Sequence, residues 1–114
     1  MFRLLIIDNK LAENKLLILY ILSFYKKAVS SVEISDIAIA NDILSYFTLL
    51  KYLKELERDK YVVFSDSSGN LYINISTLGI EVLNFFIKRL DANKTSNIKN
   101  YIEKKIDYGN SQSI

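Results

Sequence analysis

The sequence predicts a mostly helical α+β fold, and three observations lead to this prediction. The 114 residues contain no proline and only three glycines, so little interrupts long helices. Half of the residues are hydrophobic and a quarter are charged, which is the balance of one globular domain. The range 61–75 is rich in aromatic and β-branched residues around a turn, which predicts a two-stranded ribbon.

The first predicted helix spans Leu11 to Ala28 and is apolar on nearly all sides. A helix of this kind is usually buried on several sides, which indicates a central position or a cover by a second subunit. We expect Lys26 and Lys27 in its last turn, where cations favour the helix dipole. Residues 1–10 are expected to form an N-terminal arm, which is compatible with a strand, an arm over a partner or a helical lead-in.

A short helix is predicted next. Ser30 lies three residues before Glu33, which is the spacing of a capping box. We therefore expect a helix over Val32 to Ile39, with Ser30 or Ser31 as its cap.

The longest amphipathic pattern predicts a helix from Asn41 to Arg58, capped by Asn41 or Asp42. Its opposite side is expected to be free, led by Ser45, Thr48 and Lys51. The side facing the core is predicted to carry Ile43, Tyr46, Phe47, Leu49, Leu50, Leu53 and Leu56.

The ribbon is predicted as two strands, Tyr61–Phe64 and Leu71–Ile75. Its turn contains Ser67, Ser68, Gly69 and Asn70, and Gly69 is the residue best able to take a positive φ.

A helix over Leu78–Leu90 is expected after the ribbon, capped by Ser76 or Thr77. Gly79 in its first turn would permit a close approach of the ribbon.

The end of the chain is predicted as one further helix, Asn97–Ile106, which Ser96 caps after a connector. We assign residues 11–90 to the main domain, 91–106 to a C-terminal helix of the same domain, and 107–114 to a flexible tail.

Several classes of function are excluded by composition. The absence of cysteine and histidine removes disulfides, thiol chemistry, thiolate or imidazole metal sites and histidine-based triads. The acidic residues form no recognisable catalytic pair, the serines lack a base, and Gly69 stands alone rather than in a phosphate-binding loop. The longest apolar run, Leu16 to Leu22, is too short to span a bilayer. We expect a cytoplasmic protein that is not an enzyme and has no cofactor, metal or membrane partner.

The order of helix, short helix, long helix, ribbon and helix resembles that of winged helix-turn-helix transcriptional regulators. The segment from Leu53 and Leu56 through Tyr61-Val62 to the cap at 76–79 is similar to PadR-like and MarR-like groups. LAENKLLILYIL at 11–22 and YFTLLKYLKEL at 46–56 also resemble a family of uncharacterised bacterial proteins with a predicted winged helix. That resemblance covers residues 11–106.

The resemblance implies a transcriptional regulator that binds double-stranded DNA as a homodimer. The helix over 41–58 would enter the major groove, and the wing over 61–75 would lie near the backbone. The expected contacts are Asn41, Ser45, Thr48, Lys51, Tyr52, Lys15, Lys26 and Lys27, with Ser67, Ser68, Gly69 and Asn70 at the wing tip.

The charge distribution leaves an alternative open. The stretch 41–75 carries four cations against five acidic residues, and its tip contains Asp66 in place of the usual arginine or lysine. DNA-binding surfaces usually concentrate positive charge. The alternative is therefore a winged-helix module that binds a protein partner instead of DNA.

A dimer interface is predicted because the predicted helices over 11–28, 78–90 and 97–106 together show more apolar surface than one small domain easily hides. The competing interpretation is that this surface packs the core of the monomer. Tyr20, Phe24, Tyr25 and Tyr101 would line a conceivable effector pocket that the sequence does not distinguish from core packing. The predicted interface residues are Leu83, Phe86, Ile87, Leu90, Tyr101 and Ile102.

Overall fold

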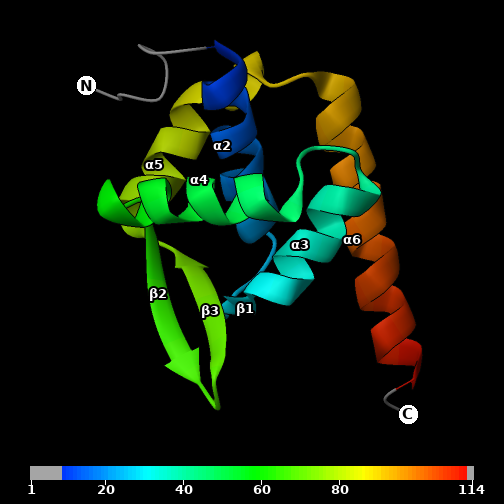
Figure 1. Cartoon of the computed structure of the whole chain (residues 1–114). Coiled ribbons are helices and arrows are strands. Elements are labelled where there is room, and N and C mark those ends of the chain that lie inside the picture. The colour runs from blue at the N-terminus through cyan, green and yellow to red at the C-terminus, as the bar shows by residue number, and fades with distance from the viewer. Residues whose placement is uncertain (1–8, 113–114) are drawn as a thin grey trace.

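The fold is a layer of helices from which a narrow β-ribbon projects (Figure 1). This computed structural model describes residues 9–112, with side chains for residues 13–105. The mostly helical α+β class predicted from the sequence is confirmed. The elements are α2 (Asn9–Leu22), β1 (Val29–Ser30), α3 (Ser31–Ala40), α4 (Tyr46–Arg58), β2 (Val62–Ser67), β3 (Asn70–Ile75), α5 (Thr77–Phe86), the 3₁₀ turn η1 (Ile87–Arg89) and α6 (Ala92–Gln112).

Helix α2 lies at the centre of the domain and contacts each of the other helices. Its residues 16–19 are at most 1 % exposed, so the predicted central position is confirmed. The helix ends at Leu22 and not at Ala28, because the hydroxyl of Ser23 donates to the Tyr20 carbonyl at 2.6 Å and the next amides tighten into a turn. The predicted placement of Lys26 and Lys27 in a last helical turn is therefore wrong. Both are exposed in the segment before β1.

Helix α3 begins as predicted and ends in a way that the sequence pattern concealed. The Oγ of Ser30 accepts a hydrogen bond from the Glu33 amide at 3.1 Å, which confirms Ser30 as the cap. At the other end Asp42 takes a left-handed conformation (φ 54°), and the Ile43 amide donates to the Ala38 carbonyl at 2.9 Å. This bond belongs to a Schellman motif, which stops a helix.

The long helix therefore starts later than predicted, at Tyr46 and not at Asn41. Ser45 is its cap, since its Oγ accepts from the Thr48 amide at 3.4 Å. Asn41 belongs to the end of α3 instead, where its side-chain amide donates to the Ile37 carbonyl at 2.8 Å.

The ribbon has the predicted turn, and its strands are longer than predicted. Ser67 pairs with Asn70 across a two-residue turn in which Ser68 (φ 52°) and Gly69 (φ 80°) both have positive φ. Two positive φ values are typical of the type I′ turn that suits a twisted hairpin. A third strand, β1, pairs with β3 in the order β1-β3-β2; the sequence did not predict it, because two residues leave no periodic pattern.

The ribbon is fixed to the helices at its base. Ser76 caps α5 by accepting from the Gly79 amide at 3.0 Å, while its hydroxyl donates to the Lys60 carbonyl at 2.6 Å. A Cβ on Gly79 would overlap the carbonyl oxygen of Tyr61 and lie 2.8 Å from Ile75 Cγ1. The predicted cap at Ser76 and the predicted close approach at Gly79 are both confirmed.

The last two helices differ from the prediction at their ends. Helix α5 gives way to η1 after Phe86, before the expected end at Leu90. Helix α6 begins at Ala92 and not after Ser96, because Asp91 Oδ1 accepts from the Asn93 and Lys94 amides at 2.8 and 3.3 Å.

The two ends of the chain were predicted to be a flexible tail and an N-terminal arm. Helix α6 continues to Gln112, so the predicted helix end at Ile106 is wrong and helix covers most of the range assigned to a flexible tail. The predicted arm lies almost wholly outside the described residues, which begin within it at Asn9.

Candidate nucleic-acid interface

Helix α4 has one buried side and one side open to solvent. Leu49, Leu53 and Leu56 are fully buried, whereas Phe47 is 83 % exposed. Phe47 was predicted on the core side, and that prediction is wrong because it lies about 200° around the helix from Leu49. Tyr46 is likewise 42 % exposed.

The open side of α4 carries a row of cations. Lys51, Lys54 and Arg58 are exposed, and with Phe47 they follow the 4-3-4 spacing of one helix face. We call these four residues the α4 stripe. The stretch 41–75 is slightly acidic as a whole, but three of its four cations share one face of α4.

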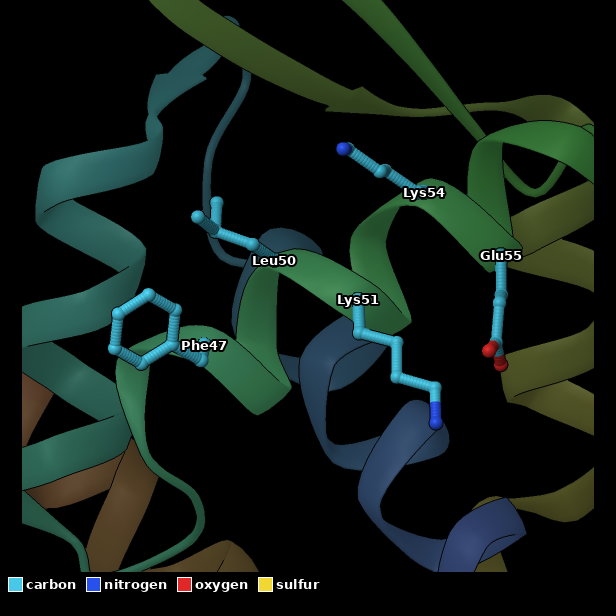
Figure 2. A pocket seen from close by; sticks show the side chains of 5 residues that line it. All are labelled: Phe47, Leu50, Lys51, Lys54 and Glu55. Carbon is cyan, nitrogen blue, oxygen red and sulfur yellow. The ribbon is translucent and has the colours of Figure 1, made fainter.

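A hollow of about 450 Å³ lies along the same side of α4, lined by Phe47, Leu50, Lys51, Lys54 and Glu55. In Figure 2, the side chains of Lys51 and Glu55 extend toward one edge of this face, and those of Leu50 and Lys54 toward the other edge. The outer surface of α4 thus presents apolar and cationic groups together and is not a smooth solvated face.

The predicted DNA contact at Lys15 is wrong in this arrangement. Lys15 is only 5 % exposed, and its Nζ lies 2.6 Å from Glu55 Oε1 and 5.9 Å from the centre of the Tyr52 ring. This hydrogen bond from Lys15 is the main reason that the pKa of Glu55 lies below its ordinary value. Lys15 and Glu55 therefore join α2 to α4, and Tyr52 is half-buried beside them.

The polar residues at the start of α4 mainly contact each other. The hydroxyls of Ser45 and Thr48 lie 2.9 Å apart in a hydrogen bond. Of the expected contacts on this helix, Lys51 is the one that belongs to the α4 stripe. The sequence interpretation placed Phe47 on the core side and did not name Lys54 and Arg58 among the contacts, although their 4-3-4 spacing with Lys51 identifies them.

The wing tip is exposed over Ser67, Ser68, Gly69 and Asn70. The whole ribbon from Val62 to Ile75 contains Asp66 and no lysine or arginine. The wing can therefore offer hydroxyls and backbone amides to a ligand, but no positive charge.

The predicted dimer interface lies mostly inside the chain. Leu83, Phe86, Leu90 and Ile102 are at most 7 % exposed, so the competing interpretation, core packing, describes them correctly. Ile87 is 37 % exposed and remains accessible.

The four residues of the conceivable effector pocket, Tyr20, Phe24, Tyr25 and Tyr101, lie among α2, α3 and α6. The rings of Tyr20 and Phe24 pack edge to face with centroids 5.0 Å apart. Burial, with Glu33 and Tyr101 nearby, raises the pKa of Tyr25 to about 12. Lys105 Nζ lies 3.1 Å from Glu33 Oε1, so this region is held by packing and an ion pair.

Two other kinds of site find no support within residues 9–112. Among residues 13–105, whose side chains the structure describes, no three carboxylates gather in a group that could hold a metal ion. None of the helices in this range is both long and apolar enough to cross a membrane.

The model of a protein family described as "Domain of unknown function (DUF4364)" matches residues 14–113. The chain belongs to the DUF4364 family. Membership agrees with the resemblance to a family of unknown function, while the PadR-like relationship and the significance of the segment at 11–22 stay predictions. None of the curated proteins matches the chain.

Two solved structures are similar to this member of the DUF4364 family. One is a mutant of MepR from a multidrug resistant S. aureus clinical isolate, with a TM-score of 0.51, 18 % identity, and coverage of 82 % of this chain and 75 % of that chain. The other is the transcriptional regulator Tm0710 from Thermotoga maritima, with a TM-score of 0.48, 18 % identity, and coverage of 87 % and 76 %. At this identity the likeness to MepR concerns the fold alone, and it confirms the winged-helix architecture.

Proposed function

We propose that this DUF4364 chain is a DNA-binding transcriptional regulator that acts as a homodimer. The observation that carries the proposal is the α4 stripe, in which Lys51, Lys54 and Arg58 face solvent on the helix that follows the turn of a winged helix-turn-helix. In this fold the second helix of the motif is the one that enters the major groove.

The dimensions of α4 suit this role. Its 13 residues make a rod of about 20 Å, and the major groove is wide enough to admit an α-helix. Arg58 Nε lies 3.7 Å from Asp59 Oδ1, but the Arg58 side chain is 68 % exposed. An exposed pair of this kind is weak, so a phosphate can replace the carboxylate at little cost.

The other contacts are expected to be weaker. Ser45 and Thr48 lie at the N-terminus of α4, where backbone amides face an approaching phosphate. The tip residues Ser67–Asn70 can hold phosphate through neutral donors, without charge assistance. Lys26 and Lys27 are exposed and provide two further cations for the DNA backbone.

The small number of cations on each copy supports the proposed homodimer. The three cations of one α4 stripe release few counterions from DNA, and two copies would double that contribution. Two copies would also read paired half-sites about 34 Å apart. Ile80 and Ile87 are 44 % and 37 % exposed and are the apolar side chains that we assign to the contact between copies. Light scattering that returns a monomer at micromolar concentration would contradict the homodimer.

The DNA-binding proposal is tested by fluorescence anisotropy on a mixed-sequence duplex of about 30 base pairs, long enough for two half-sites. The chain is titrated onto the duplex over a series of salt concentrations. We expect binding whose log K falls linearly with log salt, by about 0.9 for each phosphate contacted. The variant K51Q/K54Q/R58Q should bind at least about tenfold more weakly and with a shallower slope.

The matched control removes the same number of charges elsewhere. The variant K88Q/K99Q/K104Q changes three exposed lysines on η1 and α6 and should bind like the unaltered chain. Equal losses of DNA affinity in the two variants would show that the effect depends on net charge alone and not on the position of the α4 stripe. A complete lack of salt-sensitive binding would overturn the proposal.

The alternative function is a winged-helix module that binds a protein and not DNA. The exposure of Phe47 and Tyr46 on α4, beside a wing without cations, favours it. Its distinguishing result is a stable hetero-partner held through residues 44–58 that duplex DNA does not displace.

A further inference from the structure

The first turn of α4 presents an unusual set of side chains for a helix that reads DNA. Base contacts in helix-turn-helix proteins come from the N-terminal part of the second helix. Here that part contains Tyr46, Phe47 and Thr48 after the cap Ser45. The hydroxyls of Ser45 and Thr48 are hydrogen-bonded to each other, so the most projecting group of this turn is the ring of Phe47, at 83 % exposure.

An aromatic ring without a polar group can recognise only one feature of a base edge. In the major groove, thymine is distinguished from the other bases by its C5-methyl group, and phenylalanine is among the side chains that contact it. Guanine, adenine and cytosine are read through hydrogen bonds that Phe47 cannot make. The apolar wall formed by Phe47 and Leu50 beside the hollow on α4 is suited to take up a methyl group.

The neighbours of Phe47 point to DNA and not to a protein groove. On its helix face it is followed by Lys51, Lys54 and Arg58, each exposed. Lysine is depleted at protein–protein interfaces, whose centres lose charged residues in general. Cations beside a base-reading residue, in contrast, match the phosphates that border the groove.

We propose that Phe47 is a specificity-determining residue that recognises thymine through its C5-methyl group in the major groove. The inference rests on the proposed DNA-binding function and adds the base class that α4 reads. Each copy places one Phe47 against its half-site, so the preferred duplex contains a thymine at equivalent positions of both half-sites.

The test begins with selection of tightly bound duplexes from a random-sequence library by the full chain. The best duplex is then synthesised twice, once with thymine and once with deoxyuridine at all thymine positions. Uracil keeps the hydrogen-bonding edge of thymine and lacks only the methyl group. We expect the deoxyuridine duplex to bind about fourfold more weakly for each methyl that the ring buries.

Two variants assign the effect to Phe47. F47A should weaken binding to the thymine duplex and bind both duplexes equally, and its high exposure means that the fold is kept. K51Q removes a neighbouring cation and should weaken binding to both duplexes by the same factor, so that the preference for thymine remains.

The outcomes separate this inference from the function on which it rests. Salt-sensitive binding with equal affinity for the two duplexes, or a preference that persists in F47A, would overturn the role of Phe47 and leave DNA binding intact. Absence of any DNA binding would remove both. Capture of a protein on Phe47 that DNA cannot displace would also overturn the inference, in favour of the protein-binding alternative.

Discussion

Helix α4 and the wing are neighbours in the chain and are built in opposite ways. Helix α4 packs into the core through three fully buried leucines, is joined to α2 by an ion pair, and turns three cations to solvent. The ribbon projects away from the helices, is held at its base, and ends in a neutral tip beside Asp66 (Figure 1).

The difference indicates that DNA affinity and positioning on the DNA come from different regions of the molecule. A charged group contacts phosphate more strongly than a neutral donor, so DNA affinity should come from the α4 stripe. The wing can position the chain along the backbone but adds little attraction.

The base of the wing should be far less tolerant than its tip. G79A places a methyl group against the Tyr61 carbonyl, and we expect it to lower the free energy of unfolding by about 3 kcal/mol. G69A meets no atom within 4 Å and is penalised only by its positive φ, for a loss of about 1 kcal/mol. Urea denaturation of both variants measures the difference, and equal losses would show that the ribbon is not anchored at Gly79.

The support of α4 on α2 should depend on the Lys15–Glu55 pair. E55Q leaves the buried Lys15 without its charged partner and should cost about 2 kcal/mol of stability. E57Q on the same helix changes an exposed carboxylate and serves as the control, with little expected effect.

The effect of E55Q should also depend on pH. The folded chain holds the pKa of Glu55 below its ordinary value, so the pair stabilises the fold above the unfolded pKa of about 4.3. That stability is lost as the pH falls through the folded pKa. The gap between the unaltered chain and E55Q should therefore shrink on acidification, and a gap that is constant or grows would contradict this role.

The junction between α4 and the wing should become more stable with glycine. Lys60 occupies a left-handed conformation (φ 68°) at the end of α4, where the Tyr61 amide donates to the Leu56 carbonyl at 2.9 Å. K60G should gain about 1 kcal/mol by thermal or urea denaturation. D42G, at the equivalent position after α3, should gain less because aspartate tolerates this conformation better.

The smallest expected effect concerns the charge of the wing. D66N removes the negative charge of the ribbon and should strengthen DNA binding by about twofold in the anisotropy assay. S65A on the same strand changes an exposed serine outside the wing tip and should leave affinity unchanged. A gain larger than the loss caused by neutralising the α4 stripe would reverse the proposed contrast.

The order of elements and several local features could be predicted from the sequence, because they depend on residues that are close together in the chain. The caps at Ser30 and Ser76, the turn at Gly69 and the tight contact at Gly79 each depend on residues within a few positions of one another. The start of α4 was missed because nothing in the pattern shows that Asp42 adopts a left-handed conformation.

The candidate site was predicted less well than the fold, because burial is decided by the tertiary structure. Phe47 and Leu49 are both apolar, and the tertiary structure covers the side of α4 that carries Leu49 and leaves Phe47 exposed. The sequence predicts Lys15 to be a surface cation, because nothing in it shows that Glu55 lies beside Lys15 in the fold. The core side predicted from the sequence was too broad, since it included Phe47 about 200° around the helix from Leu49.

The most direct test of the central claim maps DNA contact onto the chain itself. A ¹⁵N-labelled sample is titrated with the mixed-sequence duplex, and backbone amide shifts are recorded by NMR. We predict the largest changes over residues 45–58, smaller changes at the wing tip over 66–70, and little change over residues 92–105 of α6. Shifts concentrated on α6 or on the wing, with α4 unaffected, would contradict the assignment of DNA binding to the α4 stripe.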